Sequence, residues 1–303
     1  MAPLASEGSR QESDLDTILE NFQPPSELLA ALKPTPSCSV SDFLQVASPP
    51  RPGSRKYFLD PLLWFTTETP NKTFESVDSL ILPSEKLCET LDSHLQEAVR
   101  SGMQSVQHPV KADVFLPIWT VRAWKWGNVL VKKQSTWRAR LNWVRETAAE
   151  EGWSAEMRES VIAEVMSTPW HMGYNSLQNG TVSTTTTAGL LSDDWVDDEQ
   201  INCIVDVIRA DMKEFSVETS TRLAFSYLSK SLEIPGQGGT ERYWGLRLQM
   251  GEVKRLLLDY NIENIHWISV KIDVTARTLN FGDSNIRKSK KVLMHLNVLL
   301  RIF

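Results

Sequence analysis

Cysteine, positive charge and long apolar runs are all scarce in this 303-residue chain. Its three cysteines (Cys38, Cys88 and Cys203) are too few and too scattered for a disulfide framework or a zinc-binding spacing. A sequence poor in cysteine is typical of a reducing compartment, so we expect an intracellular protein of the nucleus or the cytoplasm. No apolar run reaches the roughly 18 residues of a membrane span, and the first residues lack the basic start and apolar run of a secretory signal.

Charge and histidine content exclude further classes of function. The formal net charge of -6 argues against attraction of the whole protein to nucleic acid. The histidines at positions 94, 108, 171 and 295 have no partners at metal-ligand spacing, so we expect neither a metal nor another cofactor. The chain does contain enough apolar residues for a sizeable core, since they make up 41% of the sequence and include 11 tryptophans.

Composition divides the chain into four parts. Residues 1–56 are rich in Ser and Pro and hold only short apolar clusters, which predicts a mostly disordered tail. Residues 57–177 are mainly helical by periodicity, and Pro169 is expected to end the last helix of this region. Residues 178–189 (QNGTVSTTTTAG) are low in complexity and predict a linker, which leaves residues 190–303 as the last part.

One stretch within the helical region is basic and rich in tryptophan. Residues 122–145 carry seven Lys or Arg, four Trp and no acidic residue. Such a mixture can bind nucleic acid through phosphate contacts and base stacking. The other interpretation, which we favour, is a helical pair whose tryptophans pack in a core while the basic groups face water.

Residues 265–283 predict a β-hairpin. Apolar and polar residues alternate over 267–272, the period-2 pattern of a half-buried strand, and a second alternation follows over 278–282. A turn over Asp273–Ala276 sets the register, because the apolar residues then face one another across the hairpin. The expected pairs are Ile272 with Arg277, Val270 with Leu279, Ile268 with Phe281, and His266 with Asp283.

The last of these pairs carries the chemistry. A carboxylate beside an imidazole orients a general base and stabilises its charged form. His266 and Asp283 are therefore candidate catalytic residues. A surface ion pair without a function is the other interpretation of this pair.

A capped amphipathic helix is predicted just after Trp195. Acidic residues over 197–199 suit the start of a helix, because the first N–H groups and the helix dipole favour negative charge. An apolar stripe with helical spacing follows and is expected to anchor the helix. The stripe consists of Ile201, Ile204, Val205 and Ile208.

Together the helix and the hairpin resemble the ubiquitin-like-protein (SUMO) protease family of cysteine peptidases. Its members carry a tryptophan, an acidic or amide pair and an apolar helix, here Trp195 to Asn202. Later they carry His-Trp, a strand ending in Ile-Asp, a turn, and a strand ending in Asp-Ser, here within residues 266–284. The resemblance covers about residues 186–303. It implies an α+β fold, with an incomplete papain-like domain over residues 190–303.

The resemblance also implies roles for single residues. His266 would be the general base and Asp283 its orienting carboxylate. Trp195 and Trp267 would line a narrow tunnel for the Gly-Gly tail of a SUMO-type protein, since two flat indoles exclude any residue with a Cβ. For Trp267, packing at the edge of the sheet is the other interpretation. The expected partner is a ubiquitin-like protein of the SUMO type or its conjugates.

The family's nucleophile is missing from this sequence. In the family it is a cysteine in an Asp-Cys-Gly segment, preceded by a glutamine that helps to hold the oxyanion. Here no Asp-Cys-Gly occurs; the helix expected before that segment spans residues 288–303, which suggests a truncated domain. Cys203 is expected to be a buried structural residue. Without a nucleophile a His–Asp pair cannot perform covalent acyl transfer, so we expect an inactive cysteine-peptidase domain.

Two other functions remain open from the sequence. One is a non-catalytic module that binds a ubiquitin-like protein through Trp195, Trp267 and the surface nearby. The other is a nucleic-acid-associated protein, from a mobile element, that uses the basic segment over residues 122–145.

Overall fold

The chain forms two compact units, residues 1–170 and residues 171–303. The computed structural model describes residues 24–51, 61–74, 76–108, 111, 113–176, 180–214, 220–228, 239–262 and 266–282. In these ranges no helix has the length and apolar character to cross a membrane. The boundary between the units lies before the linker predicted over residues 178–189.

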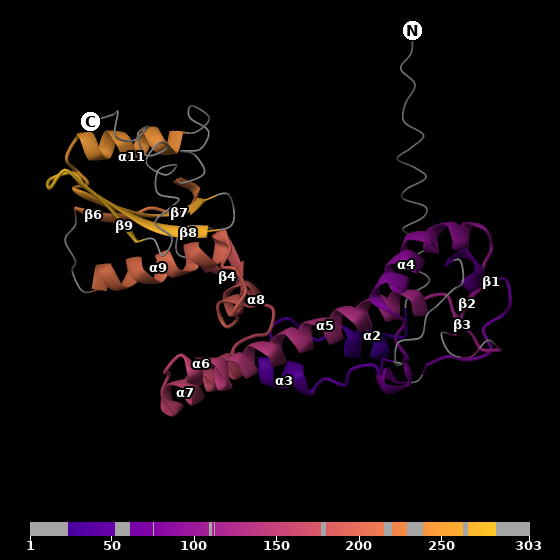
Figure 1. Cartoon of the computed structure of the whole chain (residues 1–303). Coiled ribbons are helices and arrows are strands. Elements are labelled where there is room, and N and C mark those ends of the chain that lie inside the picture. Colours follow the sequence, from indigo (N-terminus) through magenta and orange to yellow (C-terminus); the bar gives the residue numbers. More distant parts are fainter. Residues whose placement is uncertain are drawn as a thin grey trace, which may run out of the picture. The chain divides into compact units, whose positions relative to one another are not determined.

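The first unit consists mainly of helices, with one small antiparallel sheet in the order β1-β2-β3 (Figure 1). Its elements are α2 (Ser26–Leu32), α3 (Val40–Gln45), η1 (Pro61–Trp64), β1 (Phe65–Thr66), η2 (Val77–Ser79), α4 (Glu85–Arg100), β2 (Ser105–Gln107), β3 (Phe115–Pro117), α5 (Thr120–Arg145), α6 (Thr147–Glu150) and α7 (Ala155–Ser167). As predicted, α7 ends just before Pro169.

Helix α5 is the centre of the first unit, and α2, α3, α4, α6 and α7 all contact it. Its buried residues recur every three or four positions, which is the spacing of one helix face. Two of its tryptophans, Trp124 and Trp137, are almost completely buried. Other buried residues on this face are Thr120, Gly127, Gln134, Leu141 and Val144.

The prediction of a mostly disordered tail is wrong for residues 24–51. Leu28 and Leu32 of α2 are buried, and so are Val40 and Phe43 of α3. The ring of Phe43 stacks on Trp170, with 4.1 Å between the ring centroids. These short apolar clusters are too small to fold alone, and they bury themselves against the long helix instead. Residues 1–23 lie outside the described residues.

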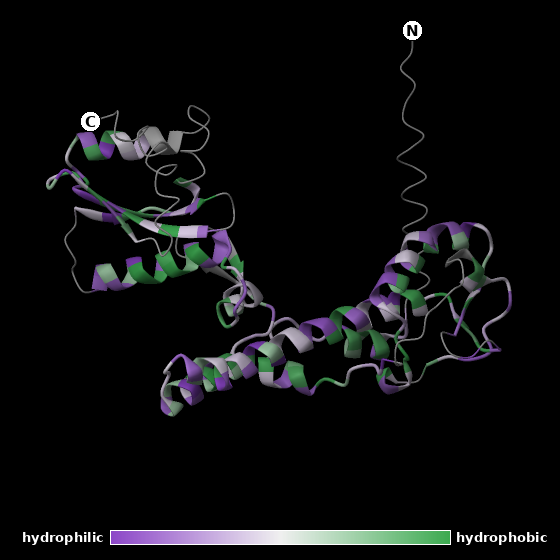
Figure 2. Ribbon diagram, viewed as in Figure 1, coloured by the Kyte–Doolittle hydropathy of each residue, from purple (hydrophilic) through white to green (hydrophobic). Residues whose placement is uncertain are grey.

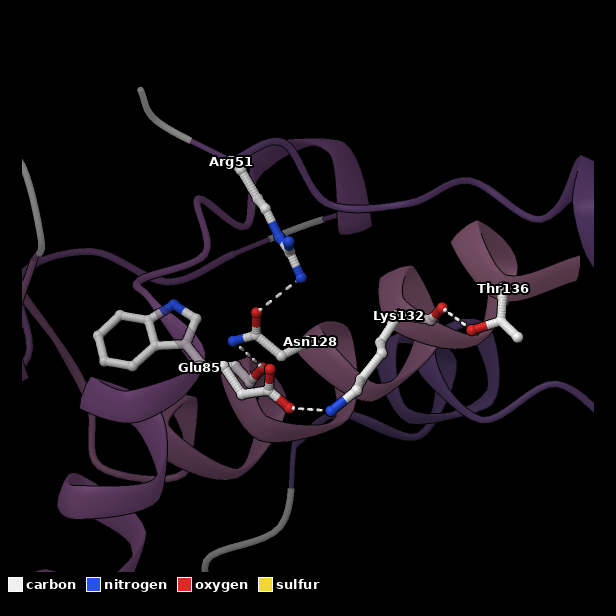
Figure 3. Close-up of polar contacts among 6 residues, drawn as sticks. Arg51, Glu85, Asn128, Lys132 and Thr136 are labelled. Atoms are coloured by element: carbon white, nitrogen blue, oxygen red, sulfur yellow. Dashed lines mark hydrogen bonds and ion pairs between the residues drawn. The ribbon is translucent and has the colours of Figure 1, made fainter. Parts of the chain in front are cut away.

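A buried amide joins α4 to α5. The side chain of Asn128 donates from Nδ2 to Sγ of Cys88 at 3.1 Å. Its Oδ1 accepts from Arg51 at 3.3 Å (Figure 3). At the surface, Nζ of Lys132 lies 2.9 Å from a carboxylate oxygen of Glu85. The long helix is thus held by contacts with α4 and with the segment around Arg51.

The second unit is a four-stranded sheet between two helices, preceded by a small hairpin (Figure 1). Its elements are β4 (Gly173–Ser176), β5 (Gly180–Ser183), α8 (Thr184–Thr187), η3 (Ala188–Leu190), α9 (Asp198–Glu214), β6 (Thr221–Leu223), α11 (Gly239–Gln249), β7 (Arg255–Ile262), β8 (His266–Asp273) and β9 (Thr278–Gly282). The strand order is β6-β7-β8-β9, with β6 parallel to β7 and the other pairs antiparallel. The predicted α+β class is confirmed.

Secondary structure replaces most of the predicted linker. Residues 180–190 form β5, α8 and η3, and β5 pairs with β4. Oγ of Ser183 accepts from the backbone N–H of Thr186, which caps α8. Serine and threonine favour helix caps as well as loops, so a run of them marks a helix start as readily as a linker.

The two faces of the main sheet differ in polarity. Alternate residues of β7 and β8, such as Leu258, Tyr260 and Val270, form an apolar face that packs with Leu248 and Trp244 of α11. The other face carries polar residues and faces α9, which lies on the opposite side of the sheet from α11 (Figure 1).

The predicted register of the hairpin is wrong by two residues. Val270 pairs with Phe281 and Ile272 with Leu279, instead of with Leu279 and Arg277. The turn comprises residues 274–277 and follows Asp273, whose Oδ1 accepts from the backbone N–H of Ala276 at 3.0 Å. A shift of two leaves every side chain on its predicted face, so the apolar pattern could not exclude it.

The buried face of α9 also differs from the predicted stripe. Val205 is buried, but Ile204 and Ile208 are exposed, and Asn202 and Asp206 are buried instead. Asn202 finds a partner in the segment after β6, where its Oδ1 accepts from the backbone N–H of Ser226 at 3.0 Å. Apolar residues nevertheless recur along α9 (Figure 2).

Candidate functional site

The segment that carries Trp195 ends in a well-formed helix cap. The backbone N–H of Gln200 donates to Oδ1 of Asp197 at 2.8 Å, and Oε1 of Gln200 accepts from the backbone N–H of Asp197 at 2.9 Å. This reciprocal pair is a capping box, which satisfies two donors that the start of a helix otherwise leaves without partners. The chain therefore enters α9 in a defined direction, two residues after Trp195.

A hydrogen bond joins this segment to the strand that begins with His266. Nε1 of Trp267 donates to the carbonyl oxygen of Val196 at 2.7 Å, across 71 residues of sequence. Trp267 is half-buried on the sheet face that carries Asn261, its partner in β7. The indole of Trp267 thus lies beside the residue that follows Trp195.

Trp195 itself projects into solvent. Its side chain is 75% exposed, the largest exposed fraction among the large apolar residues of the described chain. Tryptophan is rarely left in water without a reason, because its burial contributes so much apolar area. An indole left open to solvent is a feature of binding surfaces.

His266 is half-buried at the first position of β8 and pairs with Ile262. Because successive side chains of a strand point to opposite faces, His266 lies on the apolar face and Trp267 on the other. The described register of β8 and β9 ends at the pair Ser269–Gly282. This register is shifted by two residues from the predicted one, so the argument that paired His266 with Asp283 is wrong. Asp283 itself lies outside the described residues. Its role stays a prediction from the resemblance.

The cysteines offer no replacement nucleophile at this place. Cys203 is buried within α9, one turn beyond the cap, as expected of a structural residue. Cys88 is buried in the first unit, where burial raises the pKa of its thiol to about 12 although the hydrogen bond from Asn128 lowers it. A thiol with such a pKa is almost entirely protonated at neutral pH and is a poor nucleophile.

The basic segment over residues 122–145 is mainly a packing element. Trp124 and Trp137 belong to the core of the first unit and are closed to a nucleic-acid base. Lys125 lies 2.5 Å from Asp92, so this cation already has a carboxylate partner. Trp126 lines an open hollow of about 480 Å³ between α4 and α5, and Nζ of Lys33 lies 3.6 Å from its ring centroid. These contacts favour packing over phosphate binding.

A groove of about 380 Å³ runs between α9 and the polar face of the sheet. Val205 and Ile208 form its apolar side, while Ser269, Lys271 and Asn280 contribute polar groups. None of the residues predicted for the site lines this groove, so it is a separate feature.

Comparisons with known proteins give one partial likeness. No family model and no curated protein matches the chain. A solved structure described as the C-terminal Ulp1 protease domain in complex with Smt3, the yeast ortholog of SUMO, is similar to part of it, with a TM-score of 0.32 and 18% sequence identity. The match covers 43% of this chain and 58% of that one, so the chain spans less than two thirds of that domain's length.

Proposed function

We propose that the second unit is a SUMO-protease-type domain that holds the Gly-Gly tail of a ubiquitin-like protein and does not cleave it. In this proposal the tail lies between Trp195 and Trp267. Glycine is selected because a Cβ would meet one of the indoles. His266 and Asp283 are the remnant of the catalytic machinery.

One observation carries the proposal. The hydrogen bond from Trp267 to Val196 brings together the two sequence signals that define the resemblance, although they lie 71 residues apart. The 75% exposure of Trp195 supports the proposal, because an indole that binds a tail must be accessible to solvent before the tail binds. The sequence order of capped helix, strands and hairpin is also that of the family.

The lack of cleavage follows from chemistry. Acyl transfer by this family needs a thiolate that attacks the carbonyl carbon of the second glycine and displaces the group after it, and His266 can only accept the proton of that thiol. None of the three cysteines stands in an Asp-Cys-Gly segment. We therefore propose tail binding without cleavage for residues 1–303.

The test uses the whole chain and a SUMO protein in two forms. A form with a thiol-reactive group at its C-terminus should give no covalent adduct, while an unmodified form with a free Gly-Gly tail should bind saturably in calorimetry. A form that ends before the two glycines is the control and should not bind. An adduct would overturn the claim of inactivity, and equal binding of both tails would overturn the tail site.

A further inference from the structure

Gln200 makes more contacts than a helix cap requires. Its side chain is buried, with 8% exposure, and its Oε1 accepts from the backbone N–H of Asp197. Its Nε2 donates to the carbonyl oxygen of Thr186 in α8 at 3.0 Å. The amide therefore joins α8 to the start of α9.

The segment between these two helices carries Trp195 near its end. It is held at Asp197 by the amide of Gln200 and at Val196 by the indole N–H of Trp267. At its beginning, Oγ of Ser192 donates to the carbonyl oxygen of Gly189 at 2.8 Å. The loop is thus fixed on both sides of an indole that itself stands in solvent.

We propose that Gln200 is the positioning residue of Trp195. Its donation to Thr186 fixes the position of the loop against α8, so that Trp195 stands beside Trp267 before any tail binds. The inference rests on the proposed function for the identity of the ligand, but the claim about Trp195 concerns the unliganded chain. A loop held in its binding conformation avoids the entropy cost of ordering it on association.

The side chain of glutamine has two functions here that substitutions can separate. Gln200→Glu keeps an acceptor for the backbone N–H of Asp197, as glutamate does in ordinary capping boxes, but it cannot donate to Thr186. Gln200→Met keeps a similar volume and loses both hydrogen bonds. Glu199→Met places the same new side chain at the exposed neighbouring position and is the matched control.

The experiment labels the full chain with 5-fluorotryptophan and follows the ¹⁹F resonance of Trp195, assigned with Trp195→Phe. We expect both Gln200 variants to shift and broaden this resonance without a ligand and to weaken the binding of a SUMO protein with a free Gly-Gly tail about tenfold. Glu199→Met should change neither. Gln200→Glu should melt below the unmodified chain but stay folded at the temperature of the measurement, because its cap remains while its carboxylate faces the carbonyl oxygen of Thr186.

Two results would overturn the inference. One is an unchanged Trp195 resonance in both Gln200 variants. The other is recovery of the resonance and the affinity by Gln200→Glu, which would show that the cap alone matters. Failure of the unmodified chain to bind the tail would overturn the proposed function, while the resonance of the unliganded chain would still decide the role of Gln200.

Discussion

Two tryptophans of the first unit and one of the second have opposite surroundings. In the first unit Trp124 and Trp137 are 0% and 1% exposed and form the core along α5, while in the second unit Trp195 is 75% exposed. Trp124 and Trp137 lie within α5, whereas Trp195 lies just before α9. The comparison teaches that a tryptophan inside a helical period is packing, whereas one placed before a capped helix and left in solvent is available for binding.

The largest expected effect separates these uses by stability. Trp124→Ala removes a fully buried indole and should lower the free energy of unfolding by about 3–5 kcal/mol, because it loses apolar burial and leaves a cavity. Trp195→Ala should change it by less than about 0.5 kcal/mol. Urea unfolding of both variants provides the measurement. Equal losses would contradict the division between core and surface.

The next effect concerns the reactivity of Cys88, a buried thiol of the first unit. Burial raises the pKa of Cys88 to about 12, so at pH 8 its thiolate is about a thousandfold rarer than that of an ordinary cysteine. Cys38 is only partly buried, and a smaller desolvation raises its pKa. Mass spectrometry after mild alkylation should find Cys38 modified first and Cys88 modified only after unfolding. Rapid native modification of Cys88 would place it outside the core.

A smaller effect concerns affinity. Trp195→Ala should weaken the binding of a Gly-Gly tail about 30-fold, the loss typical of a central aromatic contact. The binding of the tail is measured by calorimetry with the full chain. Trp126→Ala, at a half-buried tryptophan of the first unit, is the control and should leave the affinity unchanged. The proposal fails if the two variants bind alike.

The smallest effect tests the hairpin turn of the second unit by pH. The backbone N–H of Ala276, then the guanidinium of Arg255 and the ammonium of Lys271, hold the pKa of Asp273 below its usual range. A lowered pKa in the folded state stabilises the protein above the pKa of the unfolded carboxyl, near 3.9, and this contribution is lost as the pH falls through the lower value. Asp273→Asn should therefore destabilise the protein modestly at pH 7 and hardly at all once the pH has fallen below the lowered pKa of Asp273. A difference that persists in acid would contradict this cause.

The sequence predicted features that depend on local patterns. It located the helix after Trp195, the end of α7 at Pro169, and the two strands of the hairpin, because caps, prolines and alternation are local. It also predicted the α+β class. These features required no knowledge of which residues lie opposite one another.

Other features depend on partners that a local pattern does not contain. A period-2 pattern fixes the face of each residue but permits a shift of two, and the decisive turn has Arg277 at a φ of 53°, where no glycine or asparagine signals it. The burial of Asn202 in α9 depends on Ser226, which lies 24 residues further along the chain. The helices within residues 24–51 depend on contacts with α5, which lies far along the chain.

The sequence likewise could not predict the hydrogen bond between Trp267 and Val196 in the candidate site. The resemblance suggested that Trp195 and Trp267 lie together, but the donation from Trp267 to Val196 and the tie from Gln200 to Thr186 are contacts between distant segments. A glutamine three residues after an aspartate did signal a capping box at Asp197. That signal was available in the sequence, and it leads to Gln200.

The most direct test of the central claim locates the tail on the protein. A SUMO protein with a photoreactive diazirine group placed next to its Gly-Gly tail is bound to the full chain, irradiated and digested, and the cross-linked peptides are identified by mass spectrometry. We predict cross-links to the peptides that contain Trp195 and Trp267, and Trp195→Ala should reduce them strongly at a concentration that just saturates the unmodified chain. Cross-links confined to other parts of the chain, or none at saturating concentration, would contradict the account.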